Sequence, residues 1–108
     1  MKSISSLNDR FRKSILSPGR NKLVLTPGVS ALAFLDQMTL LHRIMNFSDF
    51  NENNDPHGEH DFGDVKQKGV KYFFKIDYFD KSMKHASKNP HDPDITVRIM
   101  TVMRADEY

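Results

Sequence analysis

Hydrophobic residues recur at helical spacing in two stretches of the first half of the chain. Between residues 4 and 15 they stand three and four positions apart, which predicts a short amphipathic helix that Ser5 or Ser6 can cap. From Ser30 to about Asn46 a wider apolar stripe predicts a second, longer helix capped by Ser30. The stripe of this second helix consists of Leu32, Leu35, Met38, Leu41 and Met45.

Elsewhere the apolar positions alternate with a period of two or form short runs. Residues 70–78 predict a strand with one buried face, and residues 60–66 can pair with it as a hairpin across residues 67–69. Residues 95–104 are apolar on both parities, which is typical of a central strand, and residues 22–26 predict a short edge strand. The predicted fold class is α+β, with two helices packed on one face of a mostly antiparallel, roughly four-stranded sheet. The positions that we expect in its core include Leu35, Leu41, Phe74, Ile76 and Ile99.

Length and composition indicate one domain in a reducing compartment. The 108 residues, of which 38% are hydrophobic, suffice for a single core, so residues 1–108 are expected to form one domain. The absence of cysteine excludes disulfides, thiolate metal sites and cysteine nucleophiles. Residues 1–16 lack the apolar segment of a signal peptide, and the longest apolar stretch, Ala31 to Leu35, is too short to span a bilayer. We therefore expect a cytoplasmic protein without membrane contact.

Charge is unevenly distributed along the chain, although the formal net charge is only +2. Residues 1–43 carry seven Lys or Arg and two acids, residues 44–64 carry six acids and no Lys or Arg, and residues 65–108 carry nine bases and six acids. An acidic block between two basic ones predicts either internal charge pairing or a loop that attracts cations. It does not resemble the uniformly basic surface of a nucleic-acid-binding protein. The basic residues of the first helix, which we interpret as a solvated face, are Arg10, Arg12 and Lys13.

The segment from Asn51 to Gly63 holds most of the unusual chemistry, and three interpretations of it compete. Oxygen-bearing side chains at positions one, three and five from Asp49 fit a calcium loop, but Asn54 and His60 stand where that loop requires Gly and Glu. In the second interpretation, imidazoles and carboxylates bind a divalent metal ion. In the third, which is favoured, Asn and Asp side chains hold backbone amides in successive turns. The candidate metal ligands are His57, His60, Asp61 and Asp77.

Lys75 and Asp77 share one face of the predicted strand 70–78, where they can pair with each other or meet the neighbouring strand at His60 and Asp61. Such a cluster can perform general acid–base chemistry, but a surface ion-pair network is the favoured interpretation. The chain contains no Gly-x-Gly-x-x-Gly, P-loop or Gly-x-Ser-x-Gly motif. No catalytic residue is assigned, and no cofactor is expected.

Four sequence blocks and a closing pattern are distinctive. The blocks are Asn8–Arg12, Val24–Val29, Asn54–Gly63 and Lys75–Tyr78, and the closing pattern runs from Asp92 to Tyr108. Over nearly the whole chain they are similar to an uncharacterised proteobacterial family, domain of unknown function 3768. His57 and Phe79 stand where that family is expected to have tyrosine, and the exchange at His57 argues against a zinc ligand there. The resemblance implies a role in the maintenance or regulation of plasmids and other mobile elements, or in defeating host defence, and it implies no activity.

These observations predict a non-enzymatic interaction or regulatory module that binds another protein through its acidic, Asn- and Asp-rich loop. A nucleic-acid-processing enzyme with a basic groove is the expected class of partner, and direct binding of nucleic acid is not expected. The alternative is a small metal-assisted hydrolase or metal-binding protein that uses the four candidate metal ligands. The candidate binding residues are Asp49, Glu52, Asn54, Asp55, Glu59, His60, Asp61, Lys75 and Asp77.

Overall fold

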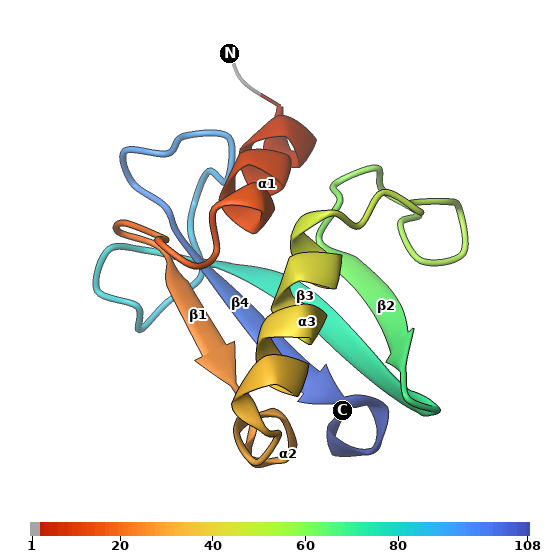
Figure 1. The fold of residues 1–108 in the computed structure, drawn as a ribbon. Helices are drawn as coiled ribbons and strands as arrows, with labels where there is room; N and C mark the ends of the chain where they lie inside the picture. The colour runs from red at the N-terminus through yellow and green to blue at the C-terminus, as the bar shows by residue number, and fades with distance from the viewer. Residues whose placement is uncertain (1–2) are drawn as a thin grey trace.

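A four-stranded mixed sheet with the strand order β1-β4-β3-β2 forms one layer of the protein. The computed structural model describes residues 3–108 (Figure 1). Its elements are α1 (Ile4–Lys13), β1 (Lys22–Leu25), α2 (Pro27–Ser30), α3 (Phe34–Met45), β2 (Phe62–Gln67), β3 (Val70–Phe79), β4 (Val97–Arg104) and the 3-10 helix η1 (Ala105–Glu107). The predicted α+β class and the mostly antiparallel sheet are confirmed.

The pairing of the strands follows the alternation in the second half of the chain. β2 and β3 form an antiparallel hairpin, and its turn residues Lys68 and Gly69 both have positive φ, 50° and 78°, as a type I′ turn requires. β3 is also antiparallel to β4. β1 is parallel to β4, with Leu23 beside Met100, and it occupies an edge of the sheet as predicted.

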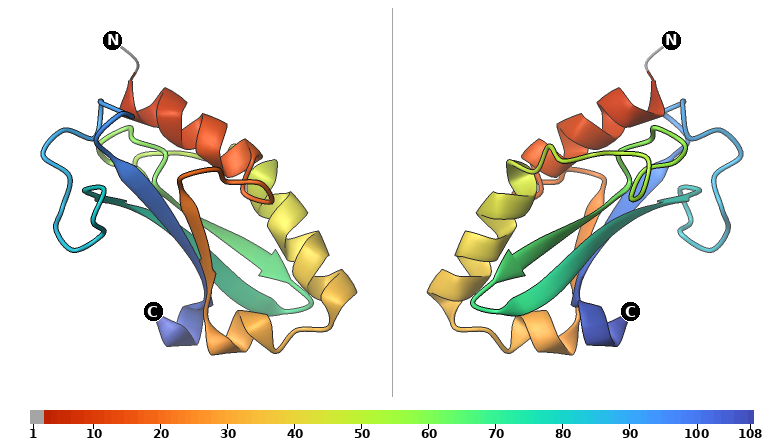
Figure 2. Two further views of the ribbon diagram at one scale, coloured as in Figure 1. Left: turned by 90° about the vertical axis from the view of Figure 1, so that its left-hand side faces the viewer. Right: turned by 90° about the vertical axis from the view of Figure 1, so that its right-hand side faces the viewer.

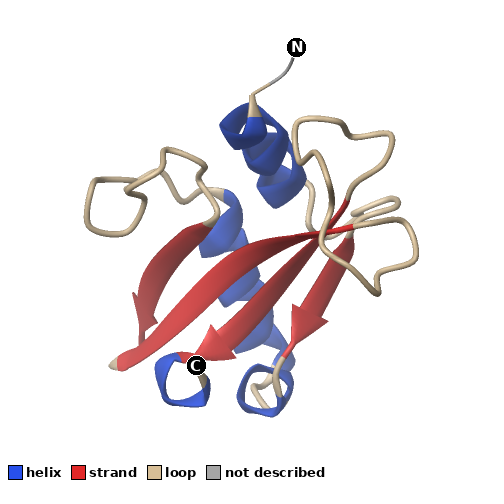
Figure 3. Ribbon diagram, turned by 180° about the vertical axis from the view of Figure 1, so that it is seen from behind, coloured by secondary structure: helices blue, strands red, loops and turns tan. Residues whose placement is uncertain are grey.

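Helices α1 and α3 cover one face of the sheet (Figure 2). Alternate residues of β3 are buried beneath them at Tyr72, Phe74 and Ile76, as the period of two predicts. Within residues 3–108 no helix crosses the middle of the opposite face (Figure 3). The fold is therefore built of two layers. No helix in this part of the chain is long and apolar enough to cross a membrane.

The N-cap of α1 lies two or three residues earlier than the predicted caps Ser5 and Ser6. Ser3 is the N-cap, and its Oγ accepts a hydrogen bond from the backbone N–H of Ser6 at 3.0 Å. The predicted apolar stripe of this helix is buried where it meets the sheet and α3. Its buried members are Leu7, Phe11 and Ile15.

The predicted second helix is divided in two. α2 ends at Ser30, the residue expected to cap a long helix, and α3 begins only at Phe34. Leu35 lies in the first turn of α3, on the side of the helix opposite its buried residues, with 77% of its surface exposed. The prediction that Leu35 lies in the core is therefore wrong. The buried stripe of α3 consists of Leu40, Leu41 and Ile44, which confirms the prediction for Leu41.

The orientation of β4 also differs from the prediction. Met100 and Val102 face the helices together with Arg98, so Ile99 lies on the opposite face and is only half-buried. Both faces of this strand are largely apolar, and the face that enters the core contains the charged residue Arg98. The pattern therefore favoured the wrong face, and Ile99 is not a core residue.

The phase of α3 can be tested with two leucines of the same helix. Leu41 is 3% exposed, and Leu41→Ala is expected to lower the free energy of unfolding by about 2–5 kcal/mol because it leaves a cavity beneath the helix. Leu35→Ala is expected to change it by less than about 0.5 kcal/mol, because that side chain already lies in solvent. Urea denaturation measures both values, and equal losses in the two variants would contradict the phase described above.

Candidate functional site

The acidic segment forms a loop between α3 and β2, residues 46–61, which we call the acidic loop. It projects beside α1 at one end of the sheet (Figure 1). Asn51 Oδ1 accepts the N–H groups of Asn53 at 2.8 Å and Asn54 at 3.3 Å. Asn54 Nδ2 in turn donates to the carbonyl oxygen of Asp49 at 2.8 Å. The predicted turns held by Asn side chains are therefore confirmed.

Asp55 organises the second half of the acidic loop. Its side chain is buried, and Oδ1 accepts the N–H groups of Glu59 at 2.9 Å and His60 at 3.1 Å. His60 has a φ of 58°, in the left-handed region that residues other than glycine seldom adopt. Because this conformation is unfavourable for an isolated residue, the hydrogen bonds to Asp55 stabilise it. Asp55 is thus part of the framework of the loop, as predicted.

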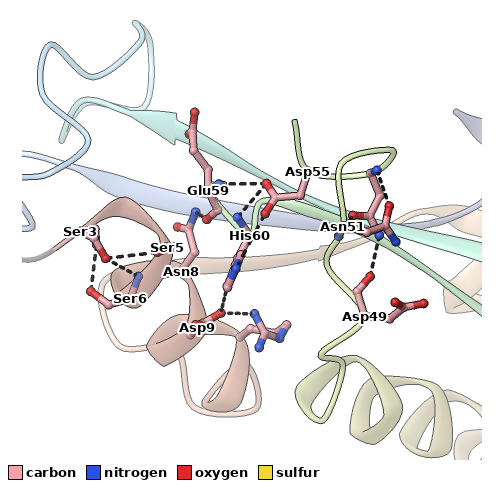
Figure 4. A network of polar contacts seen from close by, with 12 residues as sticks. Ser3, Ser5, Ser6, Asn8, Asp9, Asp49, Asn51, Asp55, Glu59 and His60 are labelled. Atoms are coloured by element: carbon pink, nitrogen blue, oxygen red, sulfur yellow. Dashed lines mark hydrogen bonds and ion pairs between the residues drawn. The ribbon is translucent and has the colours of Figure 1, made fainter. Parts of the chain in front are cut away.

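His60 is one of the residues through which the acidic loop contacts α1 (Figure 4). Its Nδ1 lies 2.9 Å from Asp9 Oδ1, and because an ionised carboxylate only accepts, Nδ1 carries a proton. Its Nε2 lies 3.8 Å from Asp55 Oδ2. The imidazole also stacks on the ring of Phe50, with centroids 4.1 Å apart and planes 2° from parallel. This arrangement fixes the ring between two carboxylates and clamps the loop to α1.

Asp9 also binds Arg12 one turn further along α1. Arg12 Nη1 donates to Asp9 Oδ1 at 2.8 Å, and the guanidinium carbon lies 5.1 Å from the centroid of the Phe50 ring. Burial alone would raise the pKa of Asp9, but the hydrogen bonds from Arg12 and His60 outweigh it and hold the pKa below its ordinary value. Arg12 is buried, so the interpretation of the basic residues of this helix as a solvated face is wrong at this position.

A second network is centred on Asn8, which is fully buried. Asn8 Nδ2 donates to the carbonyl oxygen of Glu59 at 2.9 Å and to the hydroxyl of Tyr78 at 2.8 Å. Asn8 Oδ1 accepts from Arg98 Nε at 2.7 Å. Both N–H groups and the carbonyl of this one side chain are therefore used, and they tie α1 to the acidic loop, β3 and β4.

Tyr78 extends the second network to the side chain of Glu59. Its hydroxyl donates to Glu59 Oε1 at 2.9 Å while it accepts from Asn8. Burial raises the pKa of Tyr78 well above its ordinary value, and the hydrogen bond to Glu59 raises it further. The phenol therefore keeps its proton and remains a hydrogen-bond donor.

Negative charge accumulates where the acidic loop joins β2. Burial raises the pKa of Asp61, and the nearby carboxylates of Glu59, Asp55 and Asp77 raise it further. Burial is the larger cause, and the contribution of the three carboxylates shows that several acidic side chains lie close to Asp61 at this junction.

The two acids nearest the start of the acidic loop are unpaired. Asp49 and Glu52 are exposed, and neither forms an ion pair with any residue of the described chain. Asp77, by contrast, lies 3.4 Å from Lys75 Nζ in a pair with half-exposed side chains. Such a pair contributes little to stability, as expected for a surface ion pair.

Residues 25–107 match the family model described as "Protein of unknown function (DUF3768)". The chain belongs to this family. The resemblance noted in the sequence is thereby confirmed, and the matched part of the DUF3768 domain includes the acidic loop and strands β2, β3 and β4, whereas α1 precedes it. No curated protein and no solved structure matches the chain.

The DUF3768 domain does not bring the candidate metal ligands together. His57 is exposed, His60 is turned towards Asp9 and Asp55, and Asp77 pairs with Lys75. Among residues 3–108 no group of three His, Asp or Glu side chains is placed to hold a metal ion. Lys75 and Asp77 contact each other and not His60, so the acid–base cluster considered from the sequence is not assembled either.

Several polar members of these networks were not among the predicted site residues: Asn8, Asp9, Arg12, Tyr78 and Arg98. Asn8, Arg12 and Arg98 stand at positions where the pattern of their helix or strand predicts an apolar residue. Asn8 and Arg12 follow Ile4 at intervals of four on the stripe of α1, and Arg98 shares the core-facing parity of β4 with Met100. A polar residue in an apolar register is the signal that could have identified them, because buried polar groups require partners.

The role of Asn8 can be measured through stability. Asn8→Ala leaves the buried Arg98 Nε and the carbonyl of Glu59 without their partner, at about 1–3 kcal/mol for each unsatisfied group. We expect a loss of at least about 2 kcal/mol in the free energy of unfolding. Asn53→Ala is the matched control, because the Asn53 side chain is exposed and makes no hydrogen bond within residues 3–108. Chemical denaturation that showed similar values for both variants would contradict the network.

The acidic loop is expected to be stable without a metal ion. Asp55→Ala removes the acceptor for two backbone N–H groups and should lower the melting temperature, by about 4–8 °C for each kcal/mol lost. A chelator should leave the melting temperature of the wild-type protein unchanged, as should His57→Ala, which alters an exposed residue. A drop caused by the chelator and restored by one specific divalent ion would instead favour the metal-binding alternative.

Proposed function

We propose that this domain is a non-enzymatic interaction module that binds a basic surface of another protein through its acidic loop. The observation that carries this proposal is unpaired negative charge on a loop of fixed shape. Asp49 and Glu52 are exposed without ion pairs within the described residues, and Asp61 lies among other carboxylates that raise its pKa. A partner with Lys or Arg side chains would relieve this repulsion.

The fixed shape of the loop favours binding because its backbone is already ordered before a partner binds. Asn51, Asn54 and Asp55 already hold the backbone by hydrogen bonds, and His60 fastens it to α1. A loop ordered before binding loses less conformational entropy when it meets its partner. In this proposal the candidate residues divide into two groups. The framework is formed by Asn54, Asp55 and His60. The contacts with the basic surface are made by the carboxylates of Asp49, Glu52, Glu59, Asp61 and Asp77, and Lys75 remains paired with Asp77 at their border.

The charge of the loop also suggests the class of partner. Enzymes that process nucleic acids carry basic grooves for the phosphate backbone, and such a groove is complementary to a projecting acidic loop. We therefore propose a regulatory protein of a bacterial mobile element, which occupies the basic groove of an enzyme of the element or of a host defence system. No observation favours the metal-assisted hydrolase over this function.

Charge reversal in the loop tests the proposed interface. Asp49→Lys with Glu52→Lys is expected to abolish capture of the partner by the immobilised protein, because it replaces attraction by repulsion. For the wild-type protein, surface plasmon resonance should show an association rate that falls steeply as salt is raised from about 0.05 to 0.15 M, because screening shortens the range of the attraction. Thermal denaturation should show that the variant remains folded.

The matched control places the same charge change elsewhere on the surface. Asp94→Lys with Asp106→Lys alters two exposed acids outside the acidic loop and shifts the net charge by the same amount. This control should retain the partner. If the loop variant binds as tightly as the wild-type protein at low salt, or if the control loses binding equally, the acidic loop is not the interface.

A further inference from the structure

A basic cavity of about 250 Å³ lies between α1, the connection from α1 to β1, and β4 with the segment before it, and no residue of the acidic loop lines it. Three arginines from separate segments line it: Arg10 of α1, Arg20 of the connection to β1, and Arg98 of β4. The other polar side chains of its wall are neutral, and no Asp or Glu contributes to it. The polar neutral residues are Ser14, Asn21 and Thr96.

Arg98 is the buried member of this group, with only 2% of its surface exposed. Its Nε donates to Asn8 Oδ1 at 2.7 Å and its Nη2 to the carbonyl oxygen of Pro90 at 2.6 Å. Its backbone N–H donates to Asn21 Oδ1 at 2.8 Å. Nη1 has no hydrogen-bond partner within residues 3–108, although the guanidinium offers five N–H donors.

No carboxylate of residues 3–108 pairs with Arg98, because none of the ion pairs in this part of the chain includes it. Both hydrogen-bond acceptors of its guanidinium are neutral, and the guanidinium also lies over the face of the Tyr78 ring, 5.3 Å from the centroid. Burial lowers the pKa of Arg98, which shows that its charged form loses solvation there. Because a buried charge is costly unless it is paired, a guanidinium that lines a cavity without a carboxylate is suited to an anionic ligand.

The two other arginines can complete the coordination of an anion. Arg10 is exposed and its side chain has no partner within the described residues. Arg20 is also exposed, and the hydrogen bond that its side chain makes within residues 3–108 is a long one, 3.4 Å from Nη2 to the carbonyl oxygen of Pro93. Both side chains are therefore free to turn towards a ligand that is bound at Arg98.

We propose that this cavity binds the phosphoryl group of a small phosphate monoester. Guanidinium groups donate paired hydrogen bonds to phosphate oxygens, and three of them match a dianion better than the single charge of a carboxylate. The volume is below the about 300–1,000 Å³ of sites for drug-sized ligands, so the cavity suits one phosphoryl group and a small substituent. This site is separate from the acidic loop and does not depend on its function.

Calorimetric titration of the full chain tests the site, with inorganic phosphate and phenyl phosphate as probes and sodium chloride at equal ionic strength as the reference. We expect saturable binding of both phosphates at one site. Arg10→Gln and Arg20→Gln should each weaken the binding about tenfold, because each removes a charge-assisted hydrogen bond. These exposed positions are used because substitution of the buried Arg98 can unfold the protein.

Lys13→Gln is the matched control, since it removes the same charge from an exposed position of α1 that does not line this cavity. It should change the affinity for phosphate less than about twofold, because an exposed charge outside the site is screened by salt. Absence of binding above the chloride reference overturns the proposal, and so does equal weakening by Lys13→Gln and Arg10→Gln. Tighter binding of a single-stranded oligonucleotide, weakened equally by both substitutions, also overturns it and indicates a nucleic-acid surface instead.

Discussion

The hydrogen bonds of the Asn8 carboxamide are the contacts on which the arrangement of the molecule depends. One neutral group satisfies a backbone carbonyl of the acidic loop, the phenol of Tyr78 and the guanidinium of Arg98. An aspartate in its place would supply a counter-charge to Arg98 but would lose both donors. The choice of an amide therefore keeps Arg98 buried and positively charged towards its cavity, while the same residue fixes the end of the acidic loop.

Helix α1 separates two surfaces of opposite charge and holds both in place. Two adjacent residues of α1 make the contacts with these surfaces. Asp9 binds His60 of the acidic loop, and Asn8 binds Arg98 beside the basic cavity. A substitution of a buried residue of α1 would therefore disturb both surfaces. The two proposed binding sites are consequently best distinguished at exposed positions, where a charge can be changed without loss of the shared framework.

The sequence predicts those features that depend on local pattern. The strand period of β3, the existence of the hairpin before it, and the Asn and Asp turns of the acidic loop all follow from residues close together in the chain. The predicted connection of residues 67–69 is one residue too long, because Gln67 belongs to β2. The break before α3 and the facing of Ile99 depend on contacts between distant segments, for which the apolar pattern allows two phases. Most of the framework of the candidate site could be predicted, but its attachment to α1 could not, because Asp9 and His60 stand 51 positions apart.

The order of the strands has a consequence for synthesis of the protein on the ribosome. β4 comes last of the four strands in sequence, yet it lies between β1 and β3 and pairs with both. Until Val97–Arg104 has left the exit tunnel, β1 has no neighbour and one edge of β3 is open. A nascent chain stalled before this strand thus exposes unpaired backbone and the apolar residues of β3, which are the features that recruit chaperones or promote aggregation. Completion of the sheet depends on the final strand and cannot proceed stepwise from the first.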